Sequence, residues 1–564
     1  VISYTMVGDT ENIMALFRDM PTAVCFLMIV PIIIISASSS AVAASNDFPV
    51  YRMQQYDLYG AKYGSRSASI NLEARSLISD NLIRRCAVVR IAQLQIDQLQ
   101  KAISDGLSAL LILLPANIEK VSNATLERIQ YLENNLLQVD LPIPVYFSHE
   151  TDALKSLFEE ITSSVHRDTA TSAVKAMTAV ASANSFHFLT DAGESQVISD
   201  FPIISLQGKL TGQGLEDQLP TVAIVTHYDS FSIVPKLSYG ADATASGVVA
   251  LLELARLFNL LYSEVSTRPK YNLLFLLAGG GKFNYQGTKK WIEQNVESSE
   301  ISLLAEADYV LCIDAIGQGN SLNLHVSKPP KEGTQSYLLV QEFKKVISDL
   351  YSDSVFNVVH KKVNLAEDML DWEHERFSMR RLPAGTFSHY DKPTQRGSIL
   401  DTKINSVALE RNIRVIAEGL ARHIYNLSGK SFSNKLEIFS GNMALDLDHI
   451  NSWMNHLLSQ PRSQQLINKE NRLLSAMEEI LIQYLHEVKR IVTKADKKEP
   501  EFVFYDVFES KMSVYSVKPA LFDLILAIGI AFYLCIVYIF VENFTVLTAL
   551  LPTLLLDYIE DLLF

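Results

Sequence analysis

The chain has 564 residues, of which 48% are hydrophobic and 20% are charged, and its formal net charge at pH 7 is −14. This length is too great for one simple domain, and the apolar fraction is enough to build a sizeable core. Because the charge is negative and no basic stripe runs along the chain, the sequence argues against nucleic-acid binding through phosphate neutralisation.

The N-terminal segment has the features of a secretory leader. An apolar run over 24–35 is followed by small residues over 36–45. The run is short for a membrane-spanning helix, which needs about 20 residues. The two segments predict a signal peptide over 1–44, cut near Ala43 or Ala44. An uncleaved signal anchor is the alternative, because the charges that flank the run are mixed rather than basic.

The middle of the chain predicts two α/β parts. Residues 46–215 mix helical stretches, including 169–185, with short apolar strands, which predicts a smaller N-terminal lobe. Residues 216–430 alternate strand and helix and predict a doubly wound α/β sandwich as the core. Its expected strands are 221–226, 271–278, 309–314 and 321–326, and its clearest expected helix is 246–262.

The C-terminal part predicts a membrane anchor. Residues 431–518 predict a helical and then extended membrane-proximal region, with helices over 431–500. Residues 520–541 are apolar and long enough for one transmembrane helix, which leaves 542–564 as a cytosolic tail. Signal peptide and anchor together predict a single-pass type I protein with a lumenal body, although the charges beside the anchor do not support that orientation.

Cysteines and glycosylation motifs fit a lumenal body. Cys86 and Cys312 lie in apolar, strand-like runs, so buried thiols are favoured over a disulfide. The motifs Asn123-Ala-Thr and Asn426-Leu-Ser are predicted N-glycosylation sites.

Three short motifs place His and Asp at the ends of predicted elements. His227-Tyr-Asp229 follows the strand 221–226, Asp242 opens the helix that follows, and Asp314 ends the strand 309–314. In open α/β sheets, ligands bind at the carboxyl ends of strands. We expect Asp229 to hold the second ring nitrogen of His227. Each motif alone also has a structural explanation, such as a helix cap at Asp242.

Together these motifs resemble the metal ligands of the M28 family of dinuclear zinc aminopeptidases. The resemblance implies that His389, in Thr386-Phe-Ser-His389, corresponds to the late histidine of the second zinc, with His360 and His374 as alternatives. It also implies a Glu-Glu pair at the strand-to-helix corner between the second and third motifs. One Glu of that pair is the general base and the other binds the second zinc.

This chain lacks the pair. No Asp or Glu occurs in 265–292, and the pair aligns with Gly281 and Lys282. Without a base to take a proton from a bridging water, and with a lysine that repels a second cation, the chemistry is lost. We therefore predict no catalytic residue, no bound metal and no cofactor, and an ammonium of Lys282 that pairs with a cleft aspartate. The vestigial cleft comprises His227, Asp229, Asp242, Asp314 and His389. A residual single-zinc hydrolase is the alternative.

The resemblance also extends along the chain, from about residue 48 to the anchor, to the nicalin family, which is related to nicastrin. The characteristic runs are 51–57, 279–288, 326–330, 372–377 and 500–506. This resemblance implies a non-enzymatic scaffold subunit of an endoplasmic reticulum membrane complex. Its implied partners are the nodal modulator protein and a small multi-pass membrane protein. The complex would accompany the Sec translocon and the ribosome during biogenesis of multi-pass membrane proteins. The acidic, apolar tail departs from the basic end expected of the family.

Overall fold

The computed structural model describes residues 44–542 apart from 80, 118–120, 166–184, 199–200, 297–303, 305–306, 394–396, 428–435, 495–499 and 518–519. Three predicted segments lie almost wholly outside the described residues: the signal peptide over 1–44, the helical stretch over 169–185 and the tail over 542–564. Contacts group the chain into two units, each described by itself. The larger comprises Phe48–Glu160 and Leu189–Met512, and α14 (Ala520–Glu542) lies in the other.

A mixed sheet of eight strands forms the core of the larger unit, in the order β15-β14-β16-β13-β11-β12-β10-β17. Its four central strands are parallel, and β14 and β10 pair antiparallel at their two sides. The strands are β10 (Pro202–Leu210), β11 (Thr221–His227), β12 (Asn272–Ala278), β13 (Ala307–Ile313), β14 (Ser321–Val326), β15 (Val355–His360), β16 (Ala384–Ser388) and β17 (His486–Lys494). Strands buried on both faces have nearly continuous apolar sequences, which is why β11–β13 could be predicted.

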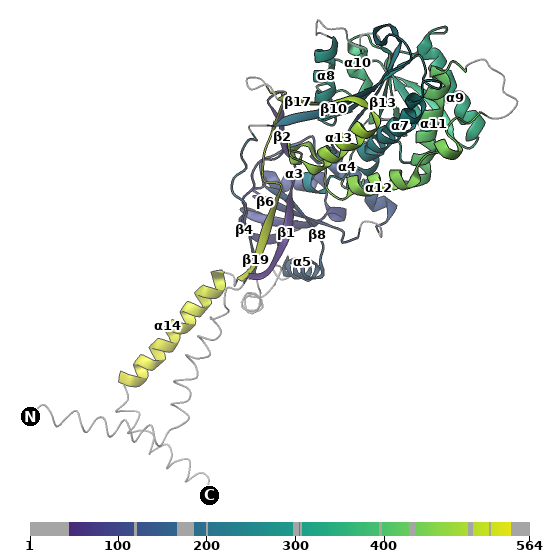
Figure 1. The fold of residues 1–564 in the computed structure, drawn as a ribbon. Helices are drawn as coiled ribbons and strands as arrows, with labels where there is room; N and C mark the ends of the chain where they lie inside the picture. The colour runs from purple at the N-terminus through teal and green to yellow at the C-terminus, as the bar shows by residue number, and fades with distance from the viewer. Residues whose placement is uncertain are drawn as a thin grey trace, which may run out of the picture. The chain divides into compact units, whose positions relative to one another are not determined.

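Helices cover both faces of this sheet (Figure 1). On one face, alternate strand residues such as Ile224 and Phe275 share a core with five helices. On the other face, residues such as Val225 and Leu276 pack against Trp291 and other side chains of two helices. The first group is α7 (Ser246–Ser263), α9 (Gln335–Leu350), α11 (Ser406–Ile424), α12 (Leu447–Leu458) and α13 (Arg472–Tyr484); the second is α8 (Gln286–Val296) and α10 (His374–Met379). The doubly wound fold predicted from the sequence is confirmed.

A second α/β layer belongs to the N-terminal part. Strands β4, β5, β6 and β8 run parallel, and β1 pairs antiparallel with β8 through Tyr51 and Arg52. A small sheet in the order β18-β2-β3-β7 joins the two ends of the larger unit. Further elements of the described residues, taken from both units, are β1 (Ala44–Arg52), β2 (Gln55–Leu58), β3 (Ala61–Ser65), β4 (Asn71–Ser76), β5 (Arg85–Arg90), α3 (Ile96–Ser104), β6 (Ala109–Leu114), α4 (Asn123–Leu136), β7 (Asp140–Leu141), β8 (Val145–His149), α5 (Asp152–Val165), β9 (Ser185–Thr190), β18 (Phe502–Phe504) and β19 (Glu509–Val517).

Two strands lie outside the part in which the sequence placed them. β10 falls inside the expected lobe 46–215 but pairs with β12 of the large sheet. β17 falls inside the stretch 431–500 expected to be helical but pairs with β10 as an edge strand. Both differences have the same cause, because hydrogen bonds to distant strands decide their conformation and local periodicity does not show those partners.

Two long apolar helices differ in burial. The stretch Ala241–Ser263 is long and apolar enough to cross a membrane by length and composition, but 83% of its apolar 18-residue window is buried, so it is a core helix. α14 carries an apolar stretch, Leu526–Tyr538, whose large side chains are exposed, Ile528 by 61% and Phe532 by 68%. The transmembrane assignment of 520–541 stays a prediction, and the exposed apolar surface of α14 fits it.

Candidate functional site

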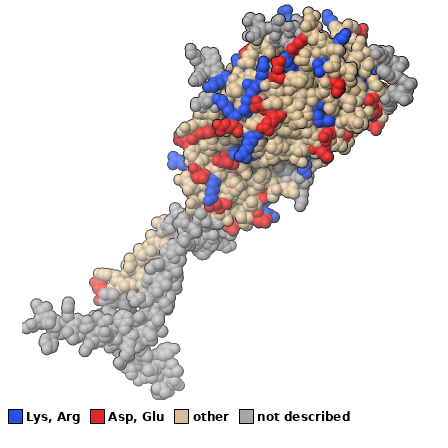
Figure 2. All heavy atoms as spheres, in the orientation of Figure 1, with Lys and Arg blue, Asp and Glu red and all other residues tan. Residues whose placement is uncertain are grey.

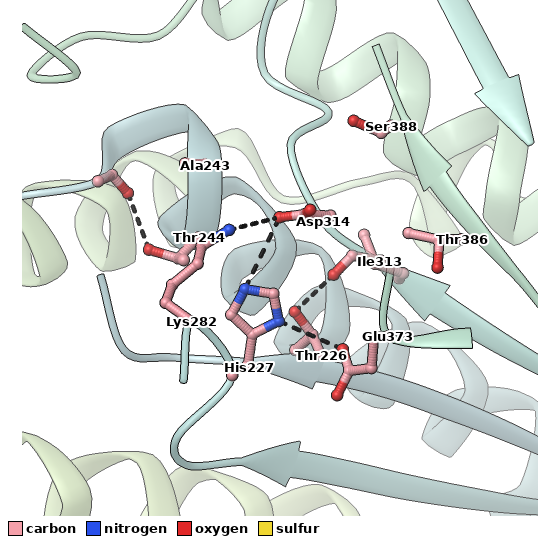
Figure 3. A network of polar contacts seen from close by, with 12 residues as sticks. Thr226, His227, Ala243, Thr244, Lys282, Ile313, Asp314, Glu373, Thr386 and Ser388 are labelled. Carbon is pink, nitrogen blue, oxygen red and sulfur yellow. Dashed lines mark hydrogen bonds and ion pairs between the residues drawn. The ribbon is translucent and has the colours of Figure 1, made fainter. Parts of the chain in front are cut away.

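The residues singled out from the sequence meet at one edge of the large sheet. His227 ends β11 in register with Ala278 of β12, and Asp314 directly follows β13. Lys282 lies four residues after β12, on the glycine-rich corner. Because β11, β12 and β13 are parallel neighbours, their carboxyl ends bring these three side chains together (Figure 3).

The ion pair predicted between Lys282 and a cleft aspartate is confirmed, and its partner is Asp314. Lys282 Nζ lies 3.2 Å from Asp314 Oδ1, and their side chains are only 5% and 3% exposed. His227 Nε2 lies 3.7 Å from the same oxygen. The ammonium therefore lies beside the atoms that would face a zinc ion in a peptidase of this fold.

Glu373, rather than Asp229, holds the other ring nitrogen of His227. Glu373 Oε2 lies 3.2 Å from His227 Nδ1, and its Oε1 accepts a hydrogen bond of 2.6 Å from Thr288 Oγ1. No local motif pointed to Glu373, although it lies in the run 372–377 that carries the family resemblance. The signal was weak, because Glu373 lies next to α10, far from His227 in sequence.

The carboxylate of Asp229 has a different task from the one expected. It accepts hydrogen bonds from the backbone N–H of Gly281 at 2.6 Å and of Lys282 at 3.1 Å. Burial raises the pKa of Asp229, whereas the charge of His227 and the hydrogen bonds from these two N–H groups lower it. Asp229 therefore fixes the backbone of the corner that carries Lys282.

Glycine at position 281 is required by packing. A Cβ on Gly281 would lie 2.2 Å from Cγ of His227, a distance that real Cβ atoms do not show. A Cβ on Gly279 would lie 2.5 Å from the backbone oxygen of Ile204. The corner thus has no room for a side chain at the first position of the expected Glu-Glu pair.

Asp242 and His389 form the other half of the cleft. Asp242 lies in a π-helical turn, Ala241–Ala245, that follows Gly240 in a left-handed conformation with φ of 58°. Its Oδ1 accepts a hydrogen bond from Gly317 N at 2.6 Å, and its Oδ2 lies 2.5 Å from Nε2 of His389. Burial, and then the charge of Asp401, raise the pKa of Asp242 to about 8. Burial lowers the pKa of His389.

Asp401 fixes this turn from outside. Its two oxygens accept hydrogen bonds from the backbone N–H groups of Asp242 and Ala243, at 2.8 and 2.9 Å. The alternatives to His389 lie elsewhere: His360 is exposed and contacts Ser327, while His374 is buried against Thr386. The structure therefore brings together His227, Asp242, Asp314 and His389, with Asp229 behind the corner.

These residues do not fit the two zinc ions that the fold family implies. Within the described ranges, no three His, Cys, Asp or Glu side chains are arranged to hold a metal ion. The corner offers an ammonium and glycines where carboxylates would be needed, and both oxygens of Asp242 already have partners. A dinuclear site needs a bridging carboxylate and a ligand set for each metal, and the described residues do not supply that set.

The remaining predicted sites are on the surface or in the core as expected. Asn123 begins α4 and Asn426 follows α11, and both side chains are exposed, so their glycosylation stays a prediction that geometry permits. Cys86 and Cys312 are free and buried, which confirms the prediction of thiols. Burial raises the pKa of Cys86 to about 12, so this thiol is unreactive.

Two comparisons with known proteins concern peptidases. The sequence model of peptidase family M28 matches residues 206–414. A zinc aminopeptidase from Bacillus subtilis is 12% identical, covers 72% of this chain and 91% of its own, and aligns with a TM-score of 0.31. Residues 206–414 are thus similar to the M28 peptidase family.

Relatives from animals define the family more narrowly. The BOS complex subunit ncln of Danio rerio is 45% identical over 89% of this chain and 91% of its own length. The BOS complex subunit NCLN of Homo sapiens is 44% identical over 93% and 94%. Nicalin of Caenorhabditis elegans is 27% identical over 94% and 96%. The chain belongs to the nicalin family of BOS complex subunits.

Proposed function

We propose that this chain is a non-enzymatic scaffold subunit of a BOS complex in the endoplasmic reticulum membrane. The observation that carries the proposal is the corner after β12. There Gly281 packs against His227 without room for a side chain, and Lys282 pairs with Asp314. The relatives named as BOS complex subunits cover nearly the whole chain, which supports the same assembly for this protein.

The loss of peptidase activity follows from the missing base. Positioned acid–base groups typically contribute about 10²–10⁴-fold to rate, and the loss of the second metal adds to that. Segment 265–292 holds no carboxylate that could take a proton from water. Restoring glutamates at Gly281 and Lys282 would displace His227, so this change alone would not restore hydrolysis.

The topology we propose is a single-pass type I protein with its body in the lumen. Three features support it: the leader-like segment over 1–44, the exposed sequons at Asn123 and Asn426, and the exposed apolar stretch of α14. Surface charge on the body is mixed. Figure 2 shows acidic and basic side chains interleaved on one face, without a continuous basic stripe there. Such a surface does not favour direct nucleic-acid contact.

The proposed partners are those that the family resemblance implies: the nodal modulator protein, a small multi-pass membrane protein and, through the complex, the Sec translocon and the ribosome. We infer that the chain assists biogenesis of multi-pass membrane proteins in this setting. The lumenal body would contact the larger lumenal partner, while α14 would contact the membrane-embedded one.

A replacement experiment tests this function. In cells depleted of their own NCLN-type subunit, expression of this chain should restore recovery of the partner subunits and of a multi-pass reporter. The variant Asp242→Asn should restore both equally well, because no catalytic step is involved. A chain that ends before α14 should restore neither. Restoration by the wild type but not by Asp242→Asn, together with zinc-dependent hydrolysis of aminoacyl substrates, would instead favour a residual single-zinc hydrolase.

A further inference from the structure

The large sheet ends in a strand that is paired on one side. β17 pairs with β10 in an antiparallel register in which Lys494 is opposite Pro202 and Lys489 is opposite Gln207. It is the last strand in the order of the sheet, and among the described residues no strand pairs with its other side. Figure 1 shows β17 beside β10, at the margin of the sheet. An open edge of this kind presents backbone donors and acceptors that another strand can join.

The direction of the backbone groups of β17 follows from its partner strand. In an antiparallel pair, the N–H and C=O of a residue point to the same side, and successive residues alternate between the two sides. The carbonyl oxygen of Ile204 in β10 accepts a hydrogen bond of 2.7 Å from Tyr228 Oη, and the N–H of Tyr228 donates to Ala278 at the end of β12. Ile204 therefore faces β12 and not β17. Because Val492 is opposite Ile204, the N–H and C=O of Val492 point outward, as do those of Arg490 two residues earlier.

The side chains at this edge favour an acidic neighbour. Lys489 and Lys494 are exposed, and Val492 is 45% exposed. The two other charged residues of the strand already have partners within the unit, in the pairs Glu487–Lys209 and Arg490–Glu478. The charge presented at the edge is therefore positive, although the whole chain has a net charge of −14.

The same charges disfavour pairing with a second copy of this chain. β17 (His486–Lys494) contains three Lys or Arg residues and one Glu. Two such strands side by side would bring like charges together, which is destabilising. Lysine on an edge strand opposes self-association for this reason. An acidic strand would instead gain opposite-charge pairs at the same positions.

We propose that β17 is a docking edge for an extended acidic segment of a partner protein, which joins the eight-stranded sheet as a further strand. Backbone hydrogen bonds to Arg490 and Val492 supply the affinity, and the alternating side chains select the segment. Lys489 and Val492 are three positions apart and so lie on opposite faces, which favours a segment that alternates acidic and apolar residues. The inference deepens the proposed function, on which it rests, because it gives the larger lumenal partner a place to bind.

Peptide binding to the full chain in detergent is the first test. The probe is a fluorescently labelled synthetic peptide of about eight residues, the length of a typical strand, in which Glu and Val alternate. Its anisotropy should show saturable binding that weakens as the salt concentration rises. Val492→Pro removes an outward N–H and leaves the ladder to β10 in place, so it should weaken binding about tenfold or more. Val492→Thr keeps that N–H and should bind nearly as the wild type does.

The contribution of charge is tested separately. The double variant Lys489→Glu, Lys494→Glu should weaken binding of the Glu peptide about tenfold or more, and should prefer a peptide with Lys in place of Glu. Lys344→Glu reverses an exposed lysine on α9 and is the matched control, which should bind as the wild type does. The double variant keeps every backbone group of β17, so it decides the question if Val492→Pro fails to fold.

Partner recovery in cells separates this inference from the proposed function. Val492→Pro and the double charge variant should lose the larger lumenal partner and retain the membrane-embedded one. Val492→Thr and Lys344→Glu should retain both. If the wild type recovers neither subunit, the proposed scaffold function fails, whatever the peptide does. If every variant recovers both subunits while the wild type does too, only the inference about β17 fails.

Several results with the purified chain would overturn the inference. One is equal binding of the Glu peptide and the Lys peptide by the wild type. Another is peptide binding that Val492→Pro leaves unchanged. A wild-type dimer in light scattering that Val492→Pro converts to a monomer would assign the edge to a second copy. If no peptide binds and partner recovery is unchanged, the lysines of β17 only protect the edge, and the inference is wrong.

Discussion

The two halves of the cleft neutralise their buried aspartates in different ways. In one half, Asp314 faces the ammonium of Lys282. In the other half, Asp242 faces His389, and burial raises the pKa of Asp242 to about 8. The ammonium of Lys282 neutralises the carboxylate of Asp314, whereas a bound proton neutralises that of Asp242. The two halves should therefore respond differently to mutation and to pH.

The largest difference should come from removing the partner of each aspartate. Lys282→Met leaves the carboxylate of Asp314 buried without its counter-charge and should lower the free energy of unfolding by about 3–5 kcal/mol. His389→Gln should lower it by only about 1 kcal/mol, because Asp242 is largely protonated near neutral pH and keeps its bond from Gly317. Urea unfolding of both variants measures this. Equal losses would show that the two halves do not differ as described.

Substitution of the corner glycine should have the next largest effect. Gly281→Ala places a Cβ against the His227 ring, and the strain should lower the free energy of unfolding by about 1–3 kcal/mol. Gly193→Ala is the matched control, since a Cβ there meets nothing within 4 Å. A Gly281→Ala protein as stable as the control would mean that the His227 half tolerates side chains at the corner.

The pH dependence of stability should separate the halves. The folded-state pKa of Asp242, about 8, lies above its ordinary value of 3.8. Its stabilising contribution is therefore fully present below about pH 4 and is lost as the pH rises through 8. Relative to Asp242→Asn, the wild type should lose at most about 1.4 kcal/mol per pH unit in this window. If the free energies of unfolding of the two proteins change in parallel between pH 5 and 8, a bound proton does not neutralise Asp242.

The smallest effect on the free energy of unfolding is expected from substitution of Glu373, which lies behind the His227 ring. Glu373→Gln keeps an oxygen for Thr288 and replaces the carboxylate with a neutral amide, so it should lower the free energy of unfolding by less than about 1 kcal/mol. Glu373→Ala leaves Nδ1 of His227 and the Thr288 hydroxyl unpaired and should cost about 1–3 kcal/mol. If both variants unfold at the same denaturant concentration, Glu373 does not act through these hydrogen bonds.

The sequence by itself determined the central strands, the core helix α7 and the position of His227, Asp242 and Asp314. These follow from local patterns, because apolar runs predict buried strands and parallel neighbours end at the same edge. The acid-free stretch 265–292 likewise could be read directly from the sequence, and with it the expected pairing of Lys282 with an aspartate.

Only the tertiary structure decided which groups meet. Glu373 contacts His227 across 146 positions of sequence, and Asp229 turns to the backbone of the corner instead. β10 pairs with β12 and β17 pairs with β10, so both strands belong to the large sheet, although local periodicity placed them elsewhere. The physical reason is the same in each case. The hydrogen-bond partners of a strand and the partner of a buried carboxylate come from segments that packing brings close together. The spacing of residues along the chain does not show which of these distant segments meet.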